Sequence, residues 1–260
     1  RISACPETNK MQGNTSLTFR RFRLGPRPIQ HPIFLRLLGV SVFGHMVRFL
    51  DFTIVAWLVV QLSDSSAAVG ALVFFRVVPF LIFGPFVGAL LDRHPRITIF
   101  RRVQLGMAFL SFAFAAVVHT GYTSLPIIFA YSTFIGLMMM LEISSRKAYV
   151  SGIIGPAFLG SAMAFDMVSL NVAWFVGSTL GGAVAKLIDP SWAYIVIGTV
   201  LVTNFMFLRR LPKMFRPDLY SSSDSALKLI REGYLFARKN PVIFAALLVV
   251  GVNNFFGYPF

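Results

Sequence analysis

Long apolar runs separated by short polar segments dominate this chain. Six of them lie at about 34–61, 67–91, 97–119, 124–145, 156–187 and 190–208. A helix that rises 1.5 Å per residue needs about 20 apolar residues to cross a bilayer. Each run meets or nearly reaches this length. The pattern predicts an all-α polytopic membrane protein with a six-helix bundle over residues 33–208.

The segments around this bundle are polar and basic. Residues 1–32 form a predicted cytoplasmic tail, in which prolines interrupt any helix. Residues 209–240 form a predicted cytoplasmic linker, and the spacing of apolar residues within 225–239 predicts an amphipathic surface helix. A seventh apolar run at 241–260 is cut by the chain end. We therefore expect the chain to be a fragment, with Met11 as a plausible true start.

Composition agrees with a membrane protein. The chain is 56% hydrophobic and 13% charged, with a mean hydropathy of +0.73, whereas soluble domains carry about 25% charged residues. Its one cysteine, Cys5, excludes a disulfide within this chain and a site made of several thiolates.

The net charge of +14 raises nucleic acid as a partner, and the positions of the basic residues argue against it. Of the 24 Lys and Arg residues, 21 lie in the tail or just after it, in 92–102, at 146–147 and in 209–240. The loops on the other side of the membrane, which follow the first, third and fifth spans at 62–66, 120–123 and 188–190, contain no Lys or Arg. This asymmetry predicts a cytoplasmic N-terminus and assigns the charge to the inner face of a cell membrane, with the lipid bilayer as partner.

A short motif follows the second apolar run. It has the pattern G-x-L-x-D-R-x-x-R and includes Gly88, Asp92, Arg93 and Arg96. It resembles the loop 2–3 signature of the major facilitator superfamily of secondary transporters, although Pro95 stands where that family usually has glycine. The resemblance implies the N-terminal six-helix bundle of a facilitator-type transporter plus the start of a second bundle.

The fifth run contains Gly177, Gly181 and Gly182, with Ser178 in place of a proline. This stretch is similar to the span 5 motif of proton-coupled exporters in the same superfamily. Small residues four apart also favour close helix crossing, so generic packing remains the alternative to a mechanistic role. A similar spacing of glycines late in the second run suggests a three-plus-three repeat.

Charged side chains inside a membrane span are costly and therefore mark candidate functional sites. His45, Arg48 and Asp51 share one broad face of the first span, and Arg76 lies near mid-depth in the second. We predict that these residues line a central cavity, with Asp51 either responding to protons or pairing with a basic group. The alternative is a static ion pair that only fixes helix packing.

A second charged group lies towards the cytoplasmic ends of the fourth and fifth spans. Glu142 and Arg146 are spaced i, i+4 and can pair on one helix face, and Asp166 can reach the same depth. With Asp92 and Arg93 they are predicted to form an ionic latch at a cytoplasmic gate. The alternative is ordinary snorkelling of charged side chains at the helix ends.

Enzyme chemistry has little support. The four histidines are scattered and form no predicted metal site, no phosphate-binding loop predicts a nucleotide cofactor, and no protease-like constellation lies within the spans. We expect no cofactor and no enzymatic activity.

The resemblance implies a secondary active transporter, monomeric when complete, that exports a small amphipathic drug or siderophore by proton antiport. Two stretches, residues 57–79 and the region of the fourth and fifth spans, are similar to the subgroup of macrolide-efflux and catecholate-siderophore exporters. The alternatives are a non-transporting scaffold or receptor, and an importer of a small solute. The residues alone leave substrate, direction and coupling ion open.

Overall fold

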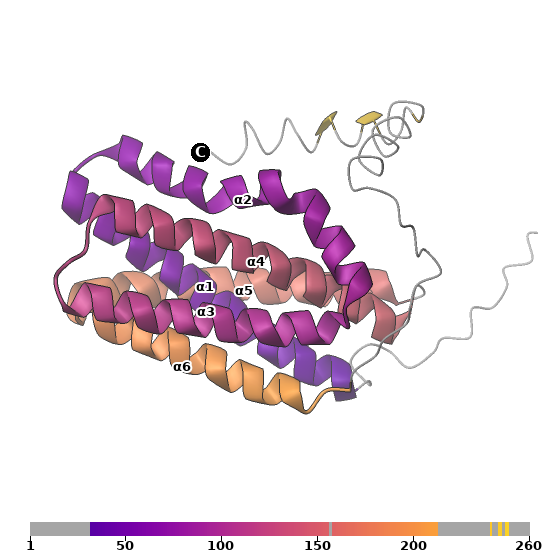
Figure 1. Cartoon of the computed structure of the whole chain (residues 1–260). Helices are drawn as coiled ribbons and strands as arrows, with labels where there is room; N and C mark the ends of the chain where they lie inside the picture. The colour runs from indigo at the N-terminus through magenta and orange to yellow at the C-terminus, as the bar shows by residue number, and fades with distance from the viewer. Residues whose placement is uncertain (1–31, 156–157, 213–239, 241–243, 246–247, 250–260) are drawn as a thin grey trace, which may run out of the picture.

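Six long helices make up most of the part of the protein that the structure describes. A computed structural model describes residues 32–155, 158–212, 240, 244–245 and 248–249. The helices are α1 (Pro32–Ser63), α2 (Ser66–Arg93), α3 (Arg96–His119), α4 (Leu125–Ile154), α5 (Leu159–Leu187) and α6 (Pro190–Arg209). Each contains a stretch long and apolar enough to cross a membrane. Figure 1 shows them gathered into one bundle, which confirms the predicted all-α polytopic fold.

Three predicted segments fall wholly or mostly outside this description. They are the N-terminal tail, the amphipathic segment 225–239 and most of the seventh span.

Helix boundaries follow from local chemistry. Pro32 and Pro190 each occupy the first position of a helix, where a missing N–H costs nothing. Asp189 caps α6, and its carboxylate accepts a hydrogen bond from the Ser191 backbone N–H at 2.8 Å. This bond lowers the pKa of Asp189 below its ordinary value. Gly155 ends α4 with a φ of 74°, a left-handed conformation that favours glycine.

One predicted boundary is wrong. The fourth span was expected to end near residue 145, with Arg146 and Lys147 in the following loop, but α4 continues to Ile154. Arg146 is only 3% exposed, because carboxylates on α4 and α5 pair with it inside the bundle. A charged pair in the sequence indicated a loop, whereas its tertiary partners keep it in the helix.

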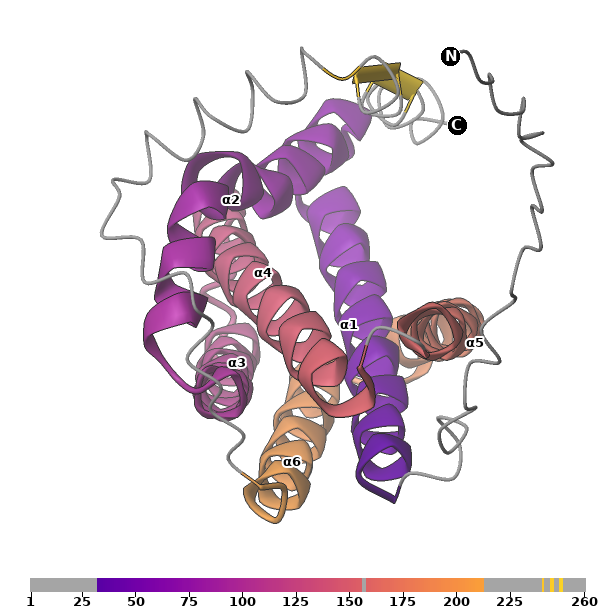
Figure 2. The same cartoon turned by 90° about the vertical axis from the view of Figure 1, so that its right-hand side faces the viewer.

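The helices pack mainly in three pairs: α1 with α5, α2 with α4, and α3 with α6. Figure 2 shows α5 alongside α1, on the side away from α3. A three-plus-three repeat would make α1 equivalent to α4 and α2 equivalent to α5. The pairs α1–α5 and α4–α2 are therefore the equivalent contacts that such a repeat requires.

Glycines allow close approach in each pair. A β-carbon added to Gly177 would lie 2.5 Å from the Met46 carbonyl oxygen, and one added to Gly181 would lie 2.8 Å from Thr53 Cβ. Gly136 meets the Arg76 carbonyl oxygen in the α2–α4 pair, and Gly198 meets the ring of Phe112 in the α3–α6 pair. At Gly136 and Gly177 the neighbouring backbone leaves no room for a side chain, whereas at Gly198 the obstacle is an aromatic ring.

Two hydrophobic clusters fill the bundle. One lies at the end where α1 begins and includes Val40 and Leu208. The other fills the opposite part and includes Val47 and Leu201. On α1 and on α6 the two clusters are therefore separated by about one to two helical turns. Buried polar side chains occupy the interval.

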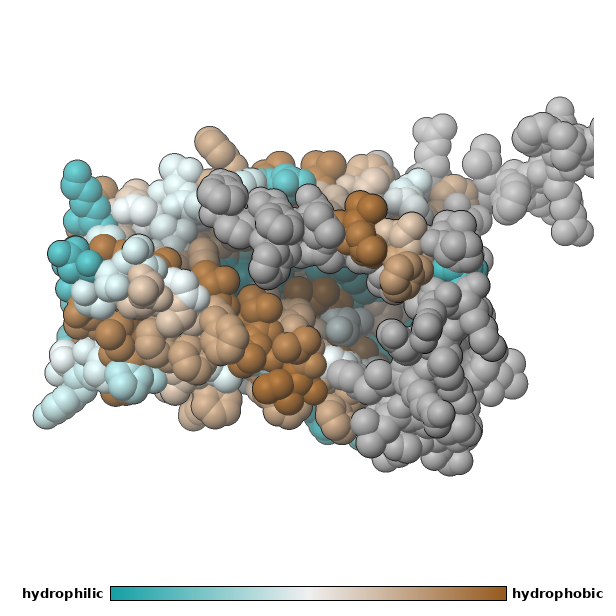
Figure 3. All heavy atoms as spheres, turned by 90° about the horizontal axis from the view of Figure 1, so that it is seen from above, coloured by the Kyte–Doolittle hydropathy of each residue, from teal (hydrophilic) through white to brown (hydrophobic). Residues whose placement is uncertain are grey.

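The surface seen in Figure 3 is mostly apolar and is hollowed between hydrophobic rims, with hydrophilic residues visible in the floor. The most exposed apolar side chains of α2 and α5 include Phe74, Leu81, Trp174 and Phe175. Such surfaces suit contact with lipid or with further helices.

Candidate functional site

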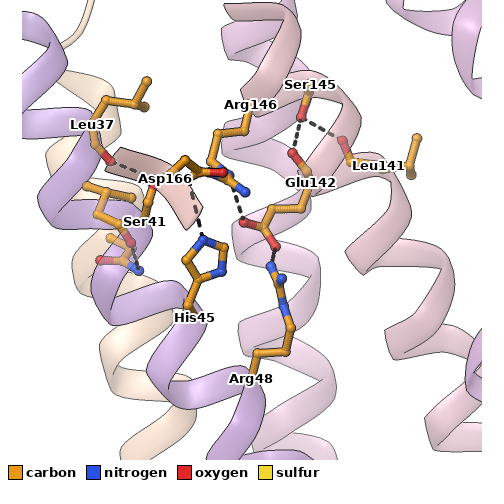
Figure 4. A network of polar contacts seen from close by, with 11 residues as sticks. Leu37, Ser41, His45, Arg48, Leu141, Glu142, Ser145, Arg146 and Asp166 are labelled. Atoms are coloured by element: carbon orange, nitrogen blue, oxygen red, sulfur yellow. Dashed lines mark hydrogen bonds and ion pairs between the residues drawn. The ribbon is translucent and has the colours of Figure 1, made fainter. Parts of the chain in front are cut away.

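A connected set of buried charged side chains separates the two hydrophobic clusters. We call it the polar layer: His45 and Arg48 on α1, Glu142 and Arg146 on α4, and Asp166 on α5. All except Asp166 are at most 9% exposed. Figure 4 shows these side chains pointing toward one another from their three helices. The polar layer thus joins α1, α4 and α5 through charge rather than apolar contact.

The ion pairs run in series through the polar layer. Arg48 Nη2 donates to Glu142 Oε2, and Glu142 Oε1 lies 3.8 Å from Arg146 Nε. Arg146 Nη1 in turn donates to Asp166 Oδ1. That same oxygen lies 3.6 Å from His45 Nε2. Each carboxylate therefore faces two basic groups.

A second buried ion pair lies among the residues of the hydrophobic cluster that includes Val47 and Leu201. Arg76 Nη2 donates to Asp51 Oδ2 at 2.6 Å, and the Tyr131 hydroxyl donates to Asp51 Oδ1 at 2.8 Å. The Tyr131 ring stacks on Phe114 with centroids 4.0 Å apart. The guanidinium of Arg76 also lies 5.3 Å from the centroid of the Phe52 ring. Asp51 thus has a partner on each carboxylate oxygen.

The buried charges of the described helices cancel. The two sites together contain three arginines and three carboxylates, all in ion pairs, with His45 counted as neutral. A buried charge is tolerated when it is paired and is strongly destabilising when its partner is removed. Any change of protonation or partner therefore has a large electrostatic consequence.

Several buried polar atoms lack a hydrogen bond within the described part of the chain. They include both ring nitrogens of His45, Arg48 Nε, Arg76 Nη1 and the Tyr194 hydroxyl. Most buried polar atoms in proteins are satisfied. Several of these donors and acceptors lie at the two charged sites.

The loop 2–3 motif is described only in part. Gly88 is exposed, and a β-carbon there would meet nothing within 4 Å. Arg96 donates to the Ala148 carbonyl oxygen of α4 at 3.0 Å. The side chains of Asp92 and Arg93 lie outside the described residues, so their part in an ionic latch stays a prediction.

The predicted glycines of α5 divide into two kinds. Gly177 and Gly181 lie against α1, whereas a β-carbon on Gly182 would meet nothing within 4 Å. The first two thus occupy the α1–α5 crossing, and Gly182 does not.

Three residues that matter here were not singled out as site residues from the sequence: Tyr131, Gly136 and Arg101. A tyrosine in an apolar span indicates a buried polar contact, since its hydroxyl needs a hydrogen-bond partner. Arg101 donates to the carbonyl oxygens of Leu208 and Leu211 at 2.9 Å and 2.6 Å, and so caps the end of α6. No local pattern indicates that contact, because it joins residues more than 100 positions apart.

A small cavity lies beside the polar layer, between α1, α4 and α5. Ser41, Arg146, Ala162 and Asp166 are among its lining residues, and its volume is about 10 Å³, enough for one water molecule. Within the described residues, no group of three His, Cys, Asp or Glu side chains is placed to hold a metal ion.

Known proteins resemble this chain over most of its length. Residues 37–260 match the family model described as the Major Facilitator Superfamily. A staphyloferrin A transporter from Staphylococcus aureus is 24% identical over 130 residues, which cover 49% of this chain and 32% of that protein. An uncharacterized MFS-type transporter, y4rN, from Sinorhizobium fredii is 24% identical over 212 residues, 81% of this chain and 51% of that protein. The chain thus spans about half, or less, of the length of the curated relatives it matches.

Proposed function

The chain belongs to the Major Facilitator Superfamily, and from this premise we propose that the complete protein is a secondary active transporter. It exports a small amphipathic molecule, a drug or a siderophore, in exchange for protons. Alternating access between two helical bundles around a midplane site drives the movement. The proposed subgroup is that of the macrolide and catecholate-siderophore exporters.

The observation that carries this proposal is the polar layer. A charged side chain at the centre of a span costs roughly 2.5–3.5 kcal/mol on insertion scales, so a scaffold that only needs to hold its shape gains little from buried charges within its spans. A transporter needs ion pairs that break and re-form between two states. Pairs in series, such as Arg48–Glu142 and Arg146–Asp166, suit that requirement.

The proposed roles divide the buried charges between a central cavity and a gate. Asp51 and Arg76, with His45 and Arg48 of the polar layer, line the central cavity and couple transport to protons. Glu142, Arg146 and Asp166, with the loop 2–3 motif, form the gate at the cytoplasmic side. The protein lies in the cell membrane as a monomer with its N-terminus in the cytoplasm, and it requires no cofactor.

One relative supports a choice of test compound. It is named as a transporter of staphyloferrin A, so that compound belongs in the panel beside amphipathic drugs and catecholates.

The test uses inside-out vesicles that contain the complete gene product and a pH-sensitive dye. An acid interior is imposed, and each compound is added outside. We expect substrate-triggered proton release from wild-type vesicles and its loss in Asp51→Asn. Asp64→Asn is the matched control, because Asp64 is exposed in the turn between α1 and α2.

Each other outcome corrects the proposal at a different point. Substrate movement without proton release contradicts antiport and leaves a facilitator driven by another gradient. Unchanged proton release in Asp51→Asn removes Asp51 from the coupling path. Movement of no compound in either direction contradicts transport and favours a scaffold or receptor.

A further inference from the structure

His45 stands apart from the other members of the polar layer. It is 1% exposed, and neither ring nitrogen makes a hydrogen bond to a described residue. Its Nε2 atom lies 3.6 Å from Asp166 Oδ1, close enough for an ion pair if the ring is charged. A neutral imidazole has one free acceptor nitrogen, and that nitrogen is the group that can take up a proton near neutral pH.

We propose that His45 is the proton-binding group of this bundle, and that its protonation transfers Asp166 from Arg146 on α4 to His45 on α1. This inference rests on the proposed proton coupling and names the group that performs it.

Charge balance favours His45 over the carboxylates. A proton on Asp51, Glu142 or Asp166 would leave an arginine buried without its counter-charge, which is strongly destabilising. A proton on His45 creates a cation directly beside Asp166, whose charge stabilises it. Among the buried titratable groups of the described helices, His45 is thus the one that can gain a proton without neutralising a carboxylate that an arginine needs as its partner.

The transfer uses a shared atom. Arg146 Nη1 and His45 Nε2 both face Asp166 Oδ1, so a charged His45 competes with Arg146 for the same oxygen. Arg146 has an alternative partner in Glu142 Oε1, 3.8 Å away. When Glu142 pairs more closely with Arg146, its ion pair with Arg48 weakens. Arg48 lies one helical turn from Asp51, so this change occurs beside the second charged site.

The charged groups around His45 from each helix support this sequence. Arg48 on α1 and Arg146 on α4 oppose its protonation, whereas Glu142 on α4 and Asp166 on α5 favour it. α6 contributes the uncharged amide of Asn204, which donates to the Val40 carbonyl oxygen at 3.3 Å. The charges of the two carboxylates and the two arginines cancel. When Arg146 leaves Asp166, the net charge close to His45 becomes more negative and stabilises the protonated ring.

The structural consequence is a looser contact between α4 and α5. α5 packs along α1 and contacts α4 only slightly, as Figure 2 also shows. The Arg146–Asp166 ion pair bridges α4 and α5 beside the small cavity. Once His45 takes Asp166, α5 stays with α1 and α4 is free to move away.

The test measures this separation directly, without substrate. Native cysteines of the complete gene product are replaced, and spin labels are placed at Gly152→Cys on α4 and Gly160→Cys on α5. A β-carbon at either position meets nothing within 4 Å. Distance distributions are recorded in lipid nanodiscs at about pH 8 and about pH 5, which bracket histidine titration.

We expect the wild-type background to show a shift toward longer distances at the lower pH. His45→Gln should keep the high-pH distribution at both values, and the control His94→Gln, at an exposed position after α2, should shift as wild type does. Asp166→Asn gives an independent check, because it removes the acceptor and should also abolish the shift.

A shift that persists in His45→Gln overturns the proposal, as does a wild-type distribution that is the same at both pH values. The vesicle assay separates this inference from the proposed function. A distance shift that His45→Gln abolishes, in a protein that moves no compound, supports the proton site and contradicts transport. Proton-coupled movement that is unchanged in His45→Gln contradicts the proton site and supports transport.

Discussion

Gly136 on α4 lies so close to the main-chain carbonyl oxygen of Arg76 on α2 that a β-carbon on Gly136 would overlap it. This contact brings the α2 backbone against α4 at the residue whose side chain pairs with Asp51 on α1. The close approach therefore fixes the position from which Arg76 reaches across the bundle.

Gly136→Ala should destabilise the protein by about 1–3 kcal/mol, the usual cost of overpacking. The α2–α4 pair must move apart, and the Asp51–Arg76 distance should lengthen with it. Thermal unfolding in detergent measures the loss. Gly39→Ala on α1 is the control, because a β-carbon there meets nothing within 4 Å, and an equal loss in both variants would contradict the packing argument.

Removal of one partner from the Asp51–Arg76 pair should cost about 3–5 kcal/mol, because the remaining charge stays buried. Asp51→Asn and Arg76→Gln each leave such a charge, whereas the double variant leaves none. We expect the double variant to be more stable than either single variant in a thermal unfolding cycle. Additive losses would show that the two side chains do not depend on each other.

Tyr131→Phe removes the hydroxyl that donates to Asp51 at 2.8 Å. Hydrogen bonds to charged groups contribute about 1.5–3 kcal/mol, so a loss of that size is expected in the free energy of unfolding. Tyr122→Phe serves as control, since Tyr122 is 79% exposed. Equal stability of Tyr131→Phe and wild type would mean that the bond adds nothing to folding.

Arg101→Lys should loosen the end of α6 while leaving its charge in place. The guanidinium donates to two carbonyl oxygens through a planar fork, and a lysine ammonium cannot reproduce this geometry. Hydrogen exchange of the amides at 208–211 should become faster by roughly tenfold, which corresponds to about 1.4 kcal/mol. Exposed Arg102→Lys should leave the exchange unchanged.

The sequence was sufficient to predict the helices and the ion pairs between residues one helical turn apart. Apolar runs located the six spans that the structure describes, because the bilayer sets a minimum length. The i, i+4 spacing predicted that Glu142 and Arg146 could pair, and the structure places them 3.8 Å apart.

Pairs between distant helices could not be predicted in the same way. Arg48 and Glu142 are 94 residues apart, and no local pattern relates them. The same limit explains the error at Arg146. A basic residue at the end of an apolar run usually faces water, whereas here Asp166 on α5, together with Glu142 on α4, makes burial favourable.

The cancelling charges of the polar layer also constrain how the chain enters the membrane. Arg48 leaves the ribosome 94 residues before Glu142, an interval of roughly 5–20 s at 5–20 residues per second. During that time α1 carries an unmatched guanidinium that lipid tolerates poorly. Pairing with Glu142 removes this cost once α4 is synthesised, so the charge of Arg48 favours early association of α1 with α4.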